Sequence, residues 1–269
     1  MTWAETRADA LSLLQSSGQY ALELEAISRH FGALVALADI NLSVKAGERH
    51  AVLGSNGAGK TTLFNAITGD FAPTTGRVRL FGEDVTDLPA YERIRRGLRR
   101  TYQISLLFDQ LSVLDNLYLA CRGVSRNRFS LRRPMRGDGR DDALMASAQT
   151  LASAVHLDAE RDSLVGTLSH GQQRQLEIGL ALAGAPRLIL FDEPAAGLSP
   201  GERGELVEIL NSLPSHIAFV LIEHDMDVAL RVSERVTMMH NGRVFKEGTP
   251  DEIENDAEVQ ELYLGGAHG

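Results

Sequence analysis

The chain has 269 residues, of which 43% are hydrophobic and 23% charged, and it is long enough to bury a full core. A formal net charge of −9 at pH 7 argues against a protein that holds nucleic acid by its overall charge. No apolar run reaches the roughly 18 residues that cross a bilayer, and the first residues lack a signal-peptide core, so we expect a cytosolic protein. The single cysteine, Cys121, excludes an internal disulfide.

Residues 1–20 form a mixed polar and apolar extension, and two strands are predicted after it. Residues 22–27 alternate between apolar and charged side chains, and residues 36–44 lead to a turn at 45–48. Between the two strands stands Phe31, an aromatic residue shortly before a glycine-rich loop. Its ring is suited either to stacking on a nucleobase or to packing on its own sheet, and both interpretations remain open.

Residues 54–62 read Gly-Ser-Asn-Gly-Ala-Gly-Lys-Thr-Thr and fit the phosphate-loop pattern G-x-x-x-x-G-K-[ST]. An apolar strand is predicted before this loop at 50–53, and a helix after it at 62–67. Glycines let the backbone N–H groups converge on one point, and the helix N-terminus adds a positive dipole. Lys60 would reach the β- and γ-phosphates, and the Thr61 hydroxyl would coordinate Mg²⁺. The expected nucleotide-binding residues here are Gly54, Ser55, Asn56, Gly57, Ala58, Gly59, Lys60, Thr61 and Thr62.

The next segment predicts a strand at 77–82, a basic helix at 91–98 and a helix near 113–120. Gln103 stands at the end of a further strand and opens an apolar segment. Its amide is suited to touching Mg²⁺ or a water molecule, and a simply solvated amide is the competing interpretation.

Residues 122–140 interrupt the periodic pattern with seven arginines and a single acid, Asp138. Three interpretations stay open. The segment is a solvated insertion, a patch that faces anionic lipid or a membrane partner, or a nucleic-acid contact.

A helix is predicted at 141–157, and residues 168–173 open a longer one that ends near residue 184. Ser169 is the expected N-cap of that helix. A serine, the glycine Gly171 and a helix N-terminus together favour anions, although an ordinary capped helix has the same features.

Two buried strands end in polar residues. Residues 187–191 lead into Asp192 and Glu193, where Asp192 would hold Mg²⁺ through its water shell and Glu193 would act as general base or orient the attacking water. Residues 217–222 lead into His224, at the sheet edge where open α/β proteins bind ligands. A hairpin across Asn241 and Gly242 and two short acidic helices complete the chain, which shows no internal repeat.

Taken together and in order, these motifs resemble the ATP-binding subunits of ABC transporters, over residues 21–264. The resemblance implies an α/β fold, namely an ABC-type P-loop ATPase with a mainly parallel core sheet, an N-terminal antiparallel β subdomain and an α-helical signature subdomain. We expect the helical subdomain at about 104–180, with the arginine-rich insertion inside it, and a tail at 265–269. The matched positions are Phe31 for adenine stacking, the phosphate loop, Gln103, the signature Ser169, Gly171 and Gln172, then Asp192, the catalytic Glu193, and His224.

The family resemblance implies ATP and Mg²⁺ as ligands, with Thr61, Gln103 and Asp192 around the metal. It implies that two such subunits pair head to tail, so that the signature of one contacts the γ-phosphate held by Lys60 of the other. The expected partners are two transmembrane permease subunits, a second ATPase subunit and, indirectly, a solute-binding protein, with no nucleic acid. The expected location is the cytoplasmic face of the cell membrane, as a peripheral subunit.

Two positions depart from the family pattern. His170 replaces the first glycine of the signature, and Ser199 stands where an aspartate is usual. Several segments, among them 61–69, 171–179 and 193–198, resemble the larger ATPase subunit of branched-chain amino acid importers. The signature with His170 is similar to that of relatives that serve urea or short amides. The alternatives to an importer subunit are an exporter ATPase and a soluble ABC ATPase without membrane partners.

Overall fold

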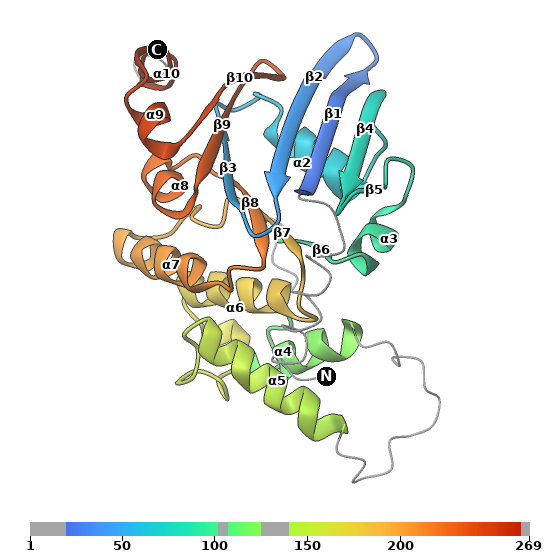
Figure 1. The fold of residues 1–269 in the computed structure, drawn as a ribbon. Coiled ribbons are helices and arrows are strands. Elements are labelled where there is room, and N and C mark those ends of the chain that lie inside the picture. Colours follow the sequence, from blue (N-terminus) through green and yellow to red (C-terminus); the bar gives the residue numbers. More distant parts are fainter. Residues whose placement is uncertain (1–19, 102–106, 125–139, 265–269) are drawn as a thin grey trace.

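The computed structural model describes residues 20–101, 107–124 and 140–264, which form two β-sheets with helices between and around them (Figure 1). The sheets meet on one side of the molecule, and a group of helices lies below the larger sheet in this view. Among the described residues, no helix combines the length and the apolar character that a membrane crossing requires.

The smaller sheet has four strands in the order β2-β1-β4-β5, and all of its pairs are antiparallel. Its strands are β1 (Tyr20–Phe31), β2 (Leu34–Lys45), β4 (Thr75–Leu80) and β5 (Glu83–Asp84). Alternate residues of β1, such as Leu22 and Leu24, are buried, as the period of two in the sequence predicts. The expected N-terminal antiparallel sheet is therefore confirmed.

The larger sheet has six strands in the order β10-β9-β3-β8-β7-β6. They are β3 (Arg49–Gly54), β6 (Leu98–Arg100), β7 (Leu188–Asp192), β8 (Ala218–Ile222), β9 (Arg235–His240) and β10 (Arg243–Gly248). Among the described strands of this sheet only the β9–β10 pair is antiparallel, and its turn residues Asn241 and Gly242 have φ of 46° and 73°. Both values suit a type I′ turn, so the mainly parallel sheet and the hairpin are as predicted.

Helix α2 (Lys60–Thr68), which follows the phosphate loop, is packed between the two sheets. Its Leu63, Phe64 and Ile67 share one apolar core with β1, β2 and alternate residues of β7 and β8. The other residues of β7 and β8 face a second core, which contains the helices on the opposite side. Burial on both faces explains why these two strands have continuous apolar sequences.

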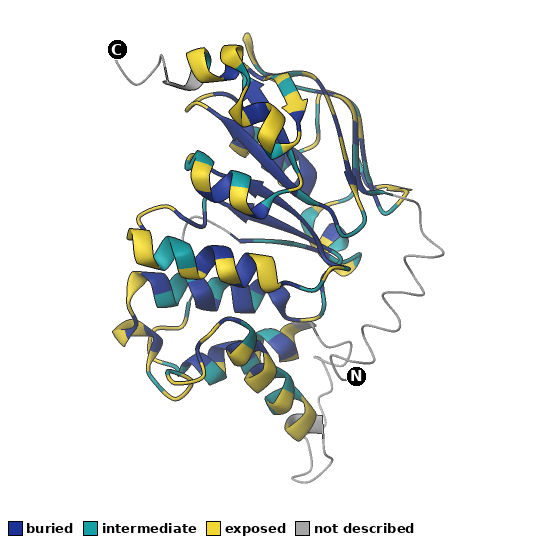
Figure 2. Ribbon diagram, turned by 60° about the vertical axis from the view of Figure 1, so that its left-hand side comes forward, coloured by how far each residue is buried: buried dark blue, intermediate teal, exposed yellow. Residues whose placement is uncertain are grey.

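Several of the remaining helices lie below the larger sheet in Figure 1, and Figure 2 shows helices buried on one side and exposed on the other. Helices α4 (Val113–Val124), α5 (Arg140–Ala154) and α6 (His170–Leu182) pack together and share a core with α7 (Pro200–Ser212). Near the chain's end, α8 (Met226–Val232), α9 (Pro250–Glu254) and α10 (Ala257–Leu264) follow. Ser169 caps α6 by accepting a hydrogen bond from the Gln172 N–H, as predicted.

One predicted helix is shorter than its sequence pattern indicated. The basic helix expected at 91–98 is α3 (Ala90–Arg95), and residue 98 already belongs to strand β6. Gly97 adopts a left-handed φ of +102°, which ends the helix, and Leu98 is buried where β6 pairs with β7. Tertiary burial of Leu98 therefore decides this boundary.

Candidate nucleotide-binding and hydrolysis site

A cleft of about 410 Å³ lies at the carboxyl ends of the parallel strands, where open α/β sheets bind their ligands. Five segments of the chain contribute to it. The cleft is lined by Leu34, Val35 and Ala36 from β2, residues 56–62 of the phosphate loop and α2, Glu193 and His224 after β7 and β8, and Asn241 and Gly242 from the hairpin. The fold thus brings most of the predicted phosphate-loop residues and the three predicted catalytic residues, Lys60, Glu193 and His224, to one cavity.

The shape of the phosphate loop depends on glycine where α2 begins. Gly59 has φ of +100° at the start of α2, and a side chain there would place its Cβ 2.8 Å from the Ala36 carbonyl oxygen. No residue with a Cβ fits this position without backbone movement. The first backbone N–H groups of α2 have no acceptor within the helix, and residues 60–62 line the cleft, as an anion site requires.

Lys60 is held inside this loop. Its Nζ donates hydrogen bonds to the carbonyl oxygens of Gly54, at 2.7 Å, and of Ser55, at 3.2 Å. Burial lowers the pKa of the ammonium below its ordinary value, and the carboxylates of Glu193, Asp192 and Glu223 offset part of that effect. A bound triphosphate would offer Lys60 better acceptors than these two carbonyls.

Glu193 and His224 are close partners although 31 residues separate them in the chain. The Nε2 atom of His224 lies 2.7 Å from Oε1 of Glu193. Glu193 has a left-handed φ of +51°, and its N–H donates to the Ile222 carbonyl at the end of β8. Such strained backbone is common at functional sites, and here it directs a carboxylate into the cleft.

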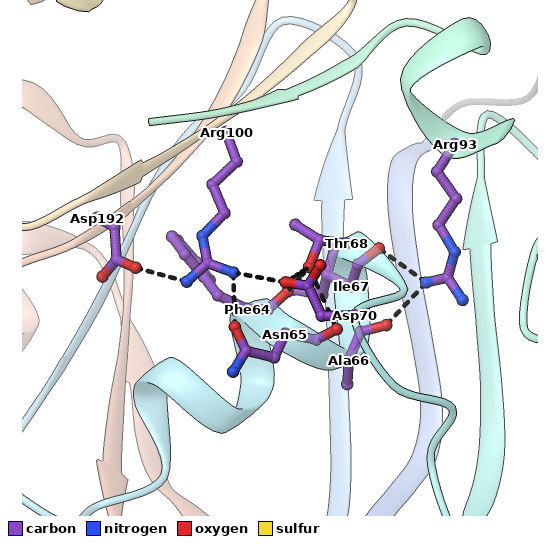
Figure 3. Close-up of polar contacts among 9 residues, drawn as sticks. All are labelled: Phe64, Asn65, Ala66, Ile67, Thr68, Asp70, Arg93, Arg100 and Asp192. Atoms are coloured by element: carbon purple, nitrogen blue, oxygen red, sulfur yellow. Dashed lines mark hydrogen bonds and ion pairs between the residues drawn. The ribbon is translucent and has the colours of Figure 1, made fainter. Parts of the chain in front are cut away.

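Asp192 provides the test of whether the site fits Mg²⁺. Its Oδ2 accepts a hydrogen bond from Arg100 at 2.6 Å, whereas its Oδ1 is buried and has no hydrogen-bond partner among the described residues (Figure 3). A buried carboxylate oxygen without a hydrogen-bond partner destabilises the folded protein unless a cation or a water molecule binds it. With the Thr61 hydroxyl in the cleft, the donor set is the hard oxygen type that Mg²⁺ prefers, so the residues fit the metal.

Glu223 was not singled out by the sequence, because a carboxylate after a buried strand carries no distinctive pattern. It is 2% exposed, and its two oxygens accept hydrogen bonds from the backbone N–H groups of Ala195 and His224. Burial raises its pKa to about 7. This carboxylate therefore ties the loop after β7 to the loop after β8, on which Glu193 and His224 stand.

The signature residues Ser169, Gly171 and Gln172 do not line the cleft of their own chain. Ser169 and Gln172 satisfy each other in a capping box, and the Gly171 N–H donates to Oε1 of Glu202 at 3.1 Å. Glu202 belongs to a second capping box, with Ser199 at the start of α7. The chain's own fold thus supplies a carboxylate to the N-terminus of α6, where an anion is favoured.

Phe31, the predicted adenine-stacking residue, does not line the cleft. The Phe31 ring packs edge-on against Phe71 with centroids 5.7 Å apart, and the Arg29 guanidinium lies over both rings. Phe31 is 46% exposed and is not among the residues that line the cleft, so stacking on adenine stays a prediction. Gln103 and most of the arginine-rich insertion lie outside the described residues.

A lysine and convergent N–H groups facing a carboxylate–histidine pair suit the cleavage of a nucleoside triphosphate, and define the class of P-loop nucleotide hydrolases. A family model described as ABC transporter matches residues 37–196, more than half of the chain. A second, described as branched-chain amino acid ATP-binding cassette transporter, matches residues 247–269. The chain belongs to the ABC transporter family and is one of its ATPases, which confirms the expected family and fold class.

Similar proteins support the closer resemblance as well. The chain is 36% identical to the high-affinity branched-chain amino acid transport ATP-binding protein BraF of Pseudomonas aeruginosa, over 91% of this chain and 98% of that protein. It is 35% identical to LivG of Escherichia coli K12, which carries the same description, with the same coverage. The lipopolysaccharide export system ATP-binding protein LptB of Acidithiobacillus ferridurans is 34% identical over 91% of this chain and 96% of its own length.

Among solved structures, the ADP conformation of MJ1267, an ATP-binding cassette of an ABC transporter, superposes with a TM-score of 0.79. It is 30% identical in sequence, and the match covers 92% of this chain and all of that one. A nucleotide-free ATP-binding cassette from an ABC transporter gives a TM-score of 0.77 at 31% identity. The arrangement of both sheets and the helices is therefore that of known cassettes.

Proposed function

We propose that this chain is the ATP-binding and hydrolysing subunit of an importer for branched-chain amino acids or related small solutes. The supporting observation is the match of 36% identity over 98% of BraF, joined to a cleft that holds Lys60, Glu193 and His224. No pocket for such a solute is part of this proposal, because selection would belong to separate subunits.

The geometry supports a direct path for hydrolysis. Lys60 and the N–H groups at the start of α2 bind the β- and γ-phosphates, and Glu193 accepts a proton from the attacking water. The water oxygen bonds to the γ-phosphorus while the bond from that phosphorus to the bridging oxygen breaks, which gives ADP and inorganic phosphate. His224, 2.7 Å from Glu193, orients the carboxylate and donates toward the γ-phosphate.

Asp192 and Thr61 would hold Mg²⁺, with Gln103 as the further predicted contact. When bound, the metal neutralises charge on the phosphates. Within the chain, Asp192 presents its unpartnered Oδ1, and Thr61 presents its hydroxyl at the start of α2.

The signature supports pairing with a second ATPase subunit. Ser169, Gly171 and Gln172 stand outside the cleft of their own chain, so they would reach a nucleotide only across an interface. We propose head-to-tail pairing, in which the γ-phosphate displaces Glu202 from the Gly171 N–H. Two permease subunits and, through them, a solute-binding protein complete the proposed assembly, with this chain on the cytoplasmic face of the membrane.

The test is to tag the chain, recover it from its native membranes in mild detergent and identify the proteins that co-purify. We expect two multi-span permeases, a second ATPase and a solute-binding protein whose ligand, found by thermal-shift screening, is a branched-chain amino acid. A binding protein that selects urea or a short amide instead would reassign the substrate to the class suggested by His170.

Export is the second candidate, since LptB is 34% identical over 96% of its length. Permeases without a solute-binding protein, co-purifying with lipid-linked components, would establish it. Recovery from the soluble fraction with ribosomal or DNA-associated partners would overturn transport altogether.

A further inference from the structure

Arg100 is the last residue of β6 and directly precedes the segment that contains Gln103. Its side chain is only 6% exposed. One guanidinium nitrogen, Nη2, donates to Oδ2 of Asp192 at 2.6 Å, and the other, Nη1, donates to Oδ1 of Asn65 at 2.6 Å and to Oδ2 of Asp70 at 3.2 Å. Figure 3 shows the guanidinium lying between Asp192 on one side and the residues of α2 on the other.

Arg100 determines which oxygen of Asp192 is available. The Asp192 side chain is 3% exposed, so its charge needs a partner inside the protein. Arg100 satisfies Oδ2, and Oδ1 stays buried without a hydrogen-bond partner among the described residues. The pair therefore holds the carboxylate in one orientation, with a single oxygen left to bind a cation or its water shell.

The neighbouring residue fixes the backbone of Asp192 as well. The Thr101 hydroxyl accepts a hydrogen bond from the Asp192 N–H at 3.2 Å, and the Thr101 N–H donates to the Leu190 carbonyl at 2.9 Å. Consecutive residues of one segment thus hold both the main chain and the side chain of Asp192.

The same guanidinium connects Asp192 to the helix of the phosphate loop. Asn65 lies one turn after Thr61 on α2, and the Arg100 guanidinium carbon is 5.5 Å from the centre of the Phe64 ring. A planar fork spans two partners at once, which a lysine ammonium on its flexible stem does not reproduce.

We infer that Arg100 is a positioning residue for the magnesium-binding carboxylate, and that it couples Asp192 to α2. The inference rests on the proposed function, in which Asp192 binds Mg²⁺. Arg100 itself touches neither nucleotide nor metal in this scheme. Its role is to keep Oδ1 of Asp192 facing the metal position.

The experiment compares Arg100→Gln, Arg100→Lys and the control Arg99→Gln. Arg99 adjoins Arg100 on β6, and the acceptors recorded for it are the backbone carbonyls of Ile94 and Leu98. Binding of a fluorescent ATP analogue is titrated with Mg²⁺, and separately in excess EDTA. In Arg100→Gln we expect the Mg²⁺ concentration for half-maximal binding to rise about tenfold, as for other residues that orient metal ligands. Affinity in EDTA should stay within about twofold, because the phosphate loop is intact.

Arg100→Lys should show a smaller rise, and Arg99→Gln none. If Arg100→Gln lowered the Mg²⁺ concentration for half-maximal binding and Arg100→Lys left it unchanged, Arg100 would act only as a positive charge that repels Mg²⁺. That result would overturn the inference. So would an unchanged requirement in a folded Arg100→Gln protein. If Arg100→Gln does not fold, Arg100→Lys carries the same test, and an unchanged requirement there has the same meaning.

A double-mutant cycle with Asp192→Asn gives an independent readout in thermal unfolding. Removing both partners should destabilise the chain less than the sum of the single changes, because Arg100→Gln alone leaves a buried carboxylate unpaired. Additive effects would contradict the coupling. Failure of the wild-type chain to bind the ATP analogue would instead count against the proposed function, so the two failures are distinguishable.

Discussion

His224 Nε2 lies 2.7 Å from Glu193 Oε1, so these two predicted catalytic residues form a close pair in the cleft. We expect Glu193→Gln to bind ATP with nearly unchanged affinity and to hydrolyse it about 100-fold to 10,000-fold more slowly, the usual range for loss of a general base. His224→Ala should also lower hydrolysis, because Glu193 loses the group that orients it. Phosphate release and equilibrium binding, measured on the same preparations, separate the two effects. Glu208→Gln, exposed on α7, is the control, and wild-type turnover in Glu193→Gln would remove Glu193 from its role.

Lys60 is buried against the carbonyl oxygens that shape the phosphate loop. We expect Lys60→Ala to weaken ATP binding by at least about 100-fold, because the phosphates lose their charged donor. Isothermal titration calorimetry measures this directly. Lys246→Ala is the matched control, since Lys246 stands on β10, pairs with Asp256 and lies outside the cleft. Retained affinity in Lys60→Ala would contradict the assignment of the phosphate loop.

Arg93 is fully buried and donates hydrogen bonds to four backbone carbonyls, those of Leu88, Ala66, Ile67 and Thr86. Two of these carbonyls lie at the end of α2, as Figure 3 shows. We expect Arg93→Lys to destabilise the chain by about 2 to 4 kcal/mol, because an ammonium cannot satisfy all four acceptors in the same geometry. Urea unfolding gives the value. Arg95→Lys, on the exposed side of α3, should change stability by less than about 0.5 kcal/mol.

Glu223 makes stability depend on pH in a definite direction. Its pKa is raised from 4.5 to about 7 by burial, so between these values the folded state binds more protons than the unfolded state. Its contribution to the free energy of unfolding is therefore most favourable below about pH 4.5 and is lost as the pH rises through about 7. The total loss is on the order of 3 kcal/mol. Urea unfolding at several pH values should show this decline in the wild type relative to Glu223→Gln, in which the group does not titrate. Parallel pH profiles of the two proteins would contradict the raised pKa.

The sequence by itself determined the class of protein. The phosphate loop at 54–62, the acidic pair after a buried strand and the histidine after the next one each depend on local spacing, and spacing is what a sequence displays. The continuous apolar sequences of β7 and β8 and the Asn241–Gly242 turn are likewise local properties. The order of these motifs along the chain was therefore sufficient for the family and the fold.

Only the tertiary structure decided what pairs with what. Asp192 and Arg100 are 92 residues apart. Arg100 is one of five arginines between residues 93 and 100, and no local pattern predicts which of them is buried against this carboxylate. The raised pKa of Glu223 and the turn of the Phe31 ring toward Phe71 likewise depend on neighbours from other elements. Desolvation and side-chain contact are properties of the assembled core, so the residues that orient the site became visible only once the sheets and α2 were packed together.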